Sequence, residues 1–193
     1  MNRLLLLLIG CSATALVFGL WIPFKALVAQ ELLALAWAES QARRMETRPW
    51  PWADTWPVAK LDMPQLGVSM IVLDGVHGES LAFGPGRVQA GTQGPVILAG
   101  HRDTHFSHLQ HLAPGNELRL QGKDQQWQRY RVTDIRVVDS RAELIDTHAL
   151  GANTLLLVTC YPFDALDARG PLRYVVEASP VDALEQKDTV VAL

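Results

Sequence analysis

The sequence has no block of basic residues, and this absence narrows the possible functions. Its 17 Lys and Arg residues stand against 20 Asp and Glu residues in 193 positions, a formal net charge of -3. Without a basic patch, a nucleic-acid-binding surface is excluded. The chain also lacks internal repeats and low-complexity tracts. Its 49% hydrophobic content is enough for the core of one globular domain with appendages.

Cysteine is scarce, with only two residues in the chain. Cys11 lies inside a hydrophobic N-terminal run, whereas Cys160 lies far along the sequence, so a disulfide between them is implausible. Cys160 is therefore expected to be a free thiol. In an exported domain, an unpaired thiol has either a partner or a catalytic role.

Long hydrophobic runs are absent except at the N-terminus. The 19 residues from Leu4 to Ile22 carry no charge, which is long enough to span a bilayer. Residues 1–24 therefore predict a transmembrane signal anchor, with Trp21 near the far interface. Arg3 and the terminal amine favour a cytoplasmic N-terminus over the reverse orientation.

This topology would put the rest of the chain on the extracytoplasmic, periplasmic side of the cytoplasmic membrane. Two alternatives stay open. One is a lipoprotein processing box ending at Cys11, and the other is cleavage after a small residue near Ala29 or Ala36.

Residues 25–57 predict an amphipathic helix followed by a linker. From Ala26 to Arg44, apolar residues recur at helical spacing among polar ones: Leu27, Leu32, Leu35 and Ala38. The Trp-Pro segment from Pro49 to Pro57 then breaks the helix. Its tryptophans suggest an arm anchored to the domain or to a membrane interface, with a ligand platform as the less common alternative.

Residues 58–180 predict a mostly β domain, with a tail at 181–193. Short apolar segments alternate with glycine-containing turns, which suggests a closed barrel or a sandwich with a few short helices. The expected strands are Ala59–Leu61, Leu66–Leu73, Pro95–Ala99, Glu117–Leu120, Gln126–Val138, Thr154–Thr159 and Leu172–Glu177, and the expected short helices are Glu79–Phe83 and Ala142–Thr147.

The strand that ends at Cys160 is the first candidate for chemistry. It is an apolar, β-branched run that Pro162 prevents from continuing far beyond the cysteine. A strand end next to a loop is a suitable place for a nucleophile. A packed core cysteine is the alternative, since free cysteine is often buried.

A thiol needs a cationic neighbour to ionise at neutral pH, and histidine is the usual one. His101 follows an apolar strand that ends in Gly100, so it is presented at a strand end as Cys160 is. Asp103, two residues further on, is a candidate to orient the imidazole, and an exposed loop acid is the alternative. His101, His105 and His108 also have a spacing that would suit zinc on a helix face.

Arg173 is the third candidate. It lies on the strand that follows the loop after Cys160, so a hairpin-like return would bring the guanidinium beside the sulfur. Its planar donors are suited to holding a carbonyl oxygen or an oxyanion. An ordinary strand arginine paired with a carboxylate is the alternative.

From about Val58 to Ala178, the chain resembles the sortases, cysteine transpeptidases that act outside the cytoplasmic membrane. The family signature Thr-Leu-x-Thr-Cys is matched by Leu156 to Cys160, except that leucine replaces the first threonine. Leu98 to Arg102 is similar to the family's histidine strand, and Leu172 to Val176 to its arginine strand. The run from Gly100 to Phe106 and the Trp-Pro segment are similar to sortases of Gram-negative bacteria.

The resemblance implies an eight-stranded sortase barrel with a groove for an extended sorting motif similar to Leu-Pro-x-Thr-Gly. It implies that Cys160 is the nucleophile, His101 the acid and base, and Arg173 the electrostatic stabiliser. Thr159, Val158 and Leu98 would contact the substrate. No calcium loop is recognisable, so no metal or cofactor is expected.

The partners implied are an exported protein with a C-terminal sorting motif, an amine acceptor that the sequence does not identify, and the membrane. Two other functions stay open. One is a thiol hydrolase that uses water in place of an amine. The other is a non-catalytic exported domain that binds zinc through its histidine cluster.

Overall fold

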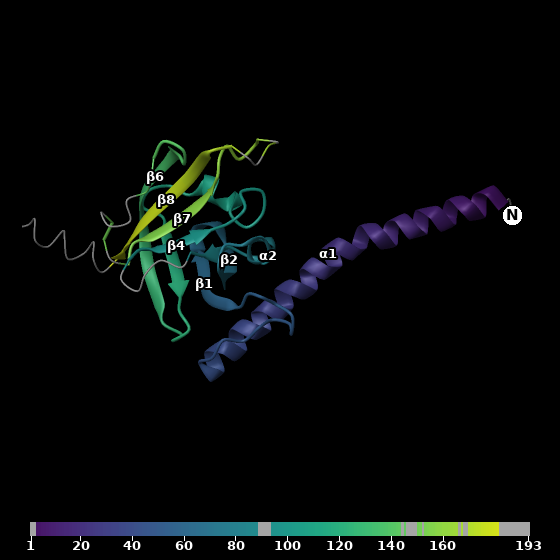
Figure 1. Ribbon diagram of the computed structural model, residues 1–193, viewed down its shortest axis with the longest axis horizontal. Coiled ribbons are helices and arrows are strands. Elements are labelled where there is room, and N and C mark those ends of the chain that lie inside the picture. The colour runs from purple at the N-terminus through teal and green to yellow at the C-terminus, as the bar shows by residue number, and fades with distance from the viewer. Residues whose placement is uncertain are drawn as a thin grey trace, which may run out of the picture.

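The computed structural model describes residues 3–88, 94–143, 145, 150–151, 153–165, 167 and 170–181. Over these residues, one long N-terminal helix leads into a β-barrel with short helices (Figure 1). The α-helices are α1 (Arg3–Arg43) and α2 (Gly78–Phe83), and the 3-10 helices are η1 (Pro64–Leu66) and η2 (Ser107–His111). The helix predicted at Glu79–Phe83 is present as α2, whereas much of the one predicted at Ala142–Thr147 falls outside the described residues.

The described residues form eight strands that close into a barrel in the order β1-β2-β3-β4-β7-β8-β6-β5. The closed eight-stranded barrel that the resemblance implies is therefore confirmed, and the sandwich that the strand pattern left open is not what forms. The strands are β1 (Pro57–Met63), β2 (Val68–Asp74), β3 (Gly86–Arg87), β4 (Val96–Ala99), β5 (Glu117–Gln121), β6 (Trp127–Asp139), β7 (Leu155–Cys160) and β8 (Leu172–Pro180). Of the predicted tail, only Val181 is described.

Strand β3 is the one that the sequence did not predict. It has only two residues and follows the turn at Gly84 and Pro85. It pairs in parallel with β2 and antiparallel with β4, and so closes the barrel between them. Two residues are too few to show the alternation by which a strand is recognised.

Strands β4 and β7 run parallel and side by side, with Val96 level with Leu155 and Ala99 level with Val158 (Figure 1). Strand β8 lies antiparallel on the other side of β7. Because parallel strands end at the same edge of a sheet, the C-terminal ends of β4 and β7 meet there. The start of β8 returns to the same edge.

The sheet around β7 has apolar residues on both faces. Leu155 and Leu157 point into the barrel and belong to its main core, which also includes Leu98 of β4 and Val176 of β8. The alternate residues of the same strands point outward and form a smaller cluster with Val138 of the neighbouring β6. The cluster consists of Ile97, Val138, Leu156, Val158 and Val175, with Ile145 and Leu150 packed against them. We call these two sides the inner and outer faces. A residue's face follows from its position along the strand.

The N-terminal helix α1 is continuous through Pro23, so the expected boundary near residue 24 is not a break in the helix. Its first half extends away from the barrel, and its second half packs against β1, β2 and α2 (Figure 1). By length and composition it is the one described helix that could cross a membrane, with a mean hydropathy of 2.0 over its most apolar window.

The face of α1 that packs on the barrel differs from the predicted one. The buried stripe consists of Ala29, Leu33, Ala36, Trp37 and Ser40, at helical spacing. The stripe predicted through Leu27 and Leu35 is wrong, since both side chains are exposed. This part of the helix carries apolar residues on more than one face, so spacing alone could not identify the face that meets the barrel.

The Trp-Pro segment folds back onto the barrel after α1 ends. Trp50 accepts a backbone hydrogen bond from Ala53, and its ring packs edge-on against Phe83 of α2 with ring centroids 4.9 Å apart. Thr55 is buried, and its hydroxyl donates a 2.9 Å bond to the carbonyl of Asp74 at the end of β2. The segment therefore ties α1 to the barrel beside α2.

Candidate active site

Strand β7 ends at Cys160, directly opposite Arg173 in the antiparallel pair with β8. The pairing continues one residue beyond the strand, where the Tyr161 amide donates a 3.0 Å bond to the Leu172 carbonyl. Cys160 is a free, half-buried thiol. Both side chains lie on the outer face, because Cys160 follows Val158 by two residues and Arg173 precedes Val175 by two.

His101 follows β4 on the other side of the cysteine strand. The ladder continues beyond β4, because the Gly100 amide donates a 3.2 Å bond to the Val158 carbonyl. Extending the parallel register from Ala99 and Val158 by two residues makes His101 level with Cys160. The His101 side chain is exposed. The topology thus brings the three predicted residues to one edge of the sheet, on three adjacent strands.

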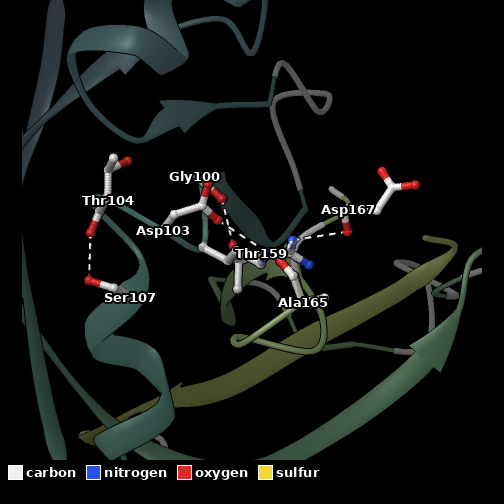
Figure 2. Close-up of polar contacts among 8 residues, drawn as sticks. Gly100, Asp103, Thr104, Ser107, Thr159, Ala165 and Asp167 are labelled. Atoms are coloured by element: carbon white, nitrogen blue, oxygen red, sulfur yellow. Dashed lines mark hydrogen bonds and ion pairs between the residues drawn. The ribbon is translucent and has the colours of Figure 1, made fainter. Parts of the chain in front are cut away.

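Thr159 joins the cysteine and histidine strands. Its side chain is buried on the inner face, and its hydroxyl donates a 2.7 Å bond to the Gly100 carbonyl (Figure 2). The residue before the cysteine is therefore bonded to the residue before the histidine. Since the hydroxyl is buried and already bonded, direct side-chain contact with a substrate, as expected from the resemblance, has no support in this geometry.

The predicted substrate contact at Leu98 is corrected by the same alternation. Leu98 is 0% exposed and lies in the barrel core, on the inner face. A peptide bound beside Cys160 cannot touch it unless the core is repacked. Ala99 and Val158, both partly exposed and paired with each other, are the residues next to the site on β4 and β7. Val158 therefore keeps its place among the candidates, and Ala99 takes that of Leu98.

Arg102 is a site residue that sequence reasoning missed. Although charged, it is only 4% exposed. Its Nη2 donates to the carbonyls of Ala165 and Asp167, at 2.6 and 3.0 Å, in the loop that follows Cys160 (Figure 2). Arg102 thus holds the loop after the cysteine against the loop after β4. No local pattern distinguished it from a surface arginine, and its position next to His101 was the only signal.

Asp103 is paired with Arg102. Its Oδ1 accepts a 3.1 Å bond from Arg102 Nε, and its side chain is largely exposed (Figure 2). Among the residues that the structure describes, no contact joins this carboxylate to His101. The expected role in orienting the imidazole therefore has no contact to support it.

Arg173 uses its guanidinium on the chain around it. Its Nη1 donates to the Gly170 carbonyl at 2.7 Å and to the Leu172 carbonyl at 2.9 Å, and the side chain is half-buried. These bonds hold a cationic group at the strand position opposite Cys160. An ordinary carboxylate pair, the alternative raised by the sequence, is not what these bonds form.

The histidines after β4 do not share a helix face. Residues 102–106 form turns, and the 3-10 helix η2 begins only at Ser107. Burial, and then the nearby charge of His101, lower the pKa of His105 below its ordinary value. In the described part of the chain, no three His, Cys, Asp or Glu side chains are grouped so that they could hold a metal ion. The zinc alternative thus has no ligand set in these residues.

Aromatic side chains line the chain just beyond the cysteine. The Tyr174 ring stacks on Tyr161 at 6.1 Å and meets the edge of Phe163 at 5.1 Å. Beside them is a hollow of about 410 Å³, lined by residues 161–164 and by Gln110 of η2. Burial, and then the neighbouring Tyr161, raise the pKa of Tyr174, which keeps the phenol neutral.

A free cysteine between a histidine-bearing and an arginine-bearing strand, at the rim of a closed barrel, is the arrangement of a cysteine-dependent enzyme. The Sortase domain model matches residues 61–181 of this chain. The chain therefore belongs to the sortase family, whose members are cysteine transpeptidases.

Known relatives agree with this family. Sortase D of Bacillus subtilis (strain 168) is 28% identical over 120 residues, which are 60% of this chain and 60% of that protein. The match thus spans less than two thirds of the relative's length. None of this supports the narrower resemblance to sortases of Gram-negative bacteria.

Solved structures show the same fold. Sortase A from Corynebacterium diphtheriae has a TM-score of 0.58 at 19% identity, over 67% of this chain and 63% of that one. A Clostridium perfringens Sortase D5 transpeptidase has a TM-score of 0.55 at 20% identity, over 79% of this chain and 96% of that one. At these identities the likeness shows the fold alone.

Proposed function

We propose that this protein is a membrane-anchored transpeptidase that cleaves a sorting motif similar to Leu-Pro-x-Thr-Gly and transfers the acyl group to an amine. The observation that carries the proposal is the direct pairing of Cys160 with Arg173, beside a parallel strand that leads to His101. A packing role for the thiol would not require a histidine and an arginine on its two neighbouring strands.

In the proposed reaction, the Cys160 thiolate attacks the carbonyl carbon of the substrate's threonine. The amide C–N bond breaks, His101 donates a proton to the departing amine, and the acyl group remains on sulfur as a thioester. An incoming amine then attacks the thioester and gives its proton to His101. The C–S bond breaks, which releases the new amide and restores the thiolate.

Arg173 stabilises the negative charge that develops on the carbonyl oxygen during both attacks. Its guanidinium is anchored to the Gly170 and Leu172 carbonyls, so it does not have to be ordered when the substrate binds. A preorganised donor of this kind acts mainly on the transition state. Ala99 and Val158 provide an apolar floor beside the thiol, on which an extended peptide would lie.

The N-terminal helix supports membrane anchoring, with residues 4–22 as the span. The barrel and its thiol would then be on the extracytoplasmic side, where exported proteins with C-terminal sorting motifs are the substrates.

The test is to incubate the full chain in detergent with Leu-Pro-x-Thr-Gly peptides and to look for an acyl adduct by mass spectrometry. The expected adduct is on Cys160, is retained in Cys11→Ser and is lost in Cys160→Ala. Added amine should convert it to an amide product. Release by water alone, whatever amine is added, would instead favour the thiol hydrolase. A folded protein with an accessible thiol and no adduct with any peptide would refute the proposal.

A further inference from the structure

An aromatic groove lies where α1 reaches the barrel. Its rings come from three parts of the chain: Trp21 and Phe24 of α1, Trp50 and Trp52 of the Trp-Pro segment, and Phe83 of α2. It has a volume of about 430 Å³. We propose that this aromatic groove is a lipid-binding surface that seats the barrel on the membrane, with acyl chains of the outer leaflet entering between the rings. The proposal rests on the membrane anchoring proposed above.

The rings of the aromatic groove are too exposed for a surface that faces only water. Trp52 is 81% exposed, Phe24 56% and Trp21 54%. Large contiguous apolar patches on a protein surface mark interaction sites. Trp21 and Phe24 already stack on each other, with centroids 6.2 Å apart, yet both side chains remain more than half exposed.

The position of the aromatic groove along α1 identifies lipid as the occupant. The uncharged segment from Leu4 to Ile22 is about 28 Å long at 1.5 Å per residue, close to the thickness of the hydrocarbon core. Trp21 is thus at the membrane surface, and Phe24 is about 4.5 Å beyond it. The head-group layer is about 5–8 Å thick on each side, so these rings lie at its depth.

The barrel begins close to the head-group layer, on the side away from the hydrocarbon core. Among the described side chains of α1, Ala29 is the first that is buried, about 12 Å along the helix from Trp21. The Trp-Pro segment then brings Trp52 back along the helix to share the groove with Trp21. Tryptophan is enriched at this depth because its ring is apolar while its N–H can bond to head groups. Little space is left between the barrel and the bilayer.

The charge in the aromatic groove agrees with a lipid surface. Lys25 is the one charged side chain among the described residues that line it. Its Nζ lies 5.7 Å from the centre of the Trp21 ring, so the ammonium is held at the rim. From there it can reach lipid phosphates while its stem follows the apolar wall. No acidic side chain in the described lining would be brought against anionic head groups.

The experiment places an environment-sensitive fluorophore at three positions of the full chain, each in a Cys11→Ser, Cys160→Ala background. Trp52→Cys labels the aromatic groove and Phe18→Cys labels the span. Trp127→Cys is the matched control, a half-exposed tryptophan on β6. In the same hairpin, Gln125 donates a hydrogen bond to the Gln41 carbonyl near the C-terminal end of α1. Gln41 is about 24 Å along the helix from Lys25. The protein is reconstituted in phosphatidylethanolamine and phosphatidylglycerol vesicles.

The expected result is strong quenching of the labels at positions 18 and 52 by nitroxide lipids, with position 52 quenched most by a shallow nitroxide. Position 127 should be quenched by aqueous iodide and several-fold less by lipid. If the label at position 18 is in lipid but the label at position 52 is quenched by iodide, membrane anchoring is supported and lipid binding in the aromatic groove is refuted. If the label at position 18 is in water, membrane anchoring is refuted, and lipid binding in the aromatic groove is refuted with it. If position 52 is shielded from both quenchers, a second protein copy covers the groove and the lipid assignment is wrong.

Discussion

The hydroxyl of Thr159 and the carbonyl of Gly100 are joined by a 2.7 Å hydrogen bond. These are the residues immediately before Cys160 and His101. The bond lies on the inner face of the sheet, whereas the thiol is on the outer face. A contact inside the barrel therefore controls the spacing of the two strands whose ends carry the chemistry.

Thr159→Val should separate these strand ends without changing the shape of the core. Valine fills the same volume but leaves the Gly100 carbonyl without its donor, which costs about 1–3 kcal/mol of the free energy of unfolding. The rate of acyl-adduct formation should fall with it. Thr159→Ser keeps the hydroxyl and should recover most of the adduct rate. Equal rates in the two variants would show that the hydrogen bond does not matter.

Gly100→Ala should destabilise the histidine strand through Phe106. A Cβ at position 100 would lie 2.9 Å from the Phe106 ring, which is fully buried in the core. Displacing this ring should lower the free energy of unfolding by about 1–3 kcal/mol, as overpacking usually does.

The matched control for this change is Gly94→Ala, whose Cβ would have no neighbour within 4 Å. Denaturant unfolding of both variants checks the prediction. Adding Phe106→Leu to Gly100→Ala should restore part of the loss. A loss of the same size at position 94 would contradict the steric explanation.

Arg102→Lys should loosen the loop after Cys160 while keeping the positive charge. A lysine ammonium cannot reproduce the planar donors that bind Ala165, Asp167 and Asp103 together. Faster hydrogen exchange around Ala165 is expected, together with a several-fold higher KM for the peptide and a smaller change in kcat. Arg131→Lys, an exposed arginine on β6, should change neither. Unchanged exchange at Ala165 would refute the tether.

Much of this structure was predictable because most strands have a recognisable pattern in the local sequence. Apolar and β-branched runs between glycines predicted seven of the eight strands. Strand ends made His101, Cys160 and Arg173 candidates one by one, and only the resemblance to the sortases joined them into one candidate site. Pairing is a long-range property, so the parallel contact of β4 with β7 and the two-residue β3 could not be read from local pattern. For the same reason, Arg102 was missed, because its partners are more than 60 residues away.

The misassigned face at Leu98 has a different cause. Side chains alternate between the two faces of a strand, so Ala99 lies on the same face as His101, and Leu98 lies on the opposite face. However, both faces of this sheet are apolar. The hydrophobicity of Leu98 therefore did not show whether it faces the barrel core or the outer face beside the thiol. The same ambiguity misdirected the stripe on α1.

Arg173→Lys should slow acylation without unfolding the domain. The ammonium keeps the charge but loses the fork that binds two carbonyls and is proposed to face the oxyanion. Loss of a preorganised donor typically lowers kcat by about 10²–10³. Single-turnover adduct formation measures this. The control is Arg136→Lys on β6, whose guanidinium pairs with Asp134 and Glu177. A similar loss in both variants would contradict a specific role for Arg173.

His105→Gln should make the domain less sensitive to acid. Burial, and then the charge of His101, lower the pKa of His105 in the folded protein below its ordinary value of 6.5, so the unfolded chain binds more protons in acid. Stability must therefore fall as the pH drops through 6.5 towards the folded pKa. Urea unfolding at pH 7.5 and 5.5 should show a smaller loss in His105→Gln than in the parent. His111→Gln, an exposed histidine at the end of η2, should leave the loss unchanged. If both variants lose as much stability as the parent, the acid sensitivity comes from other groups.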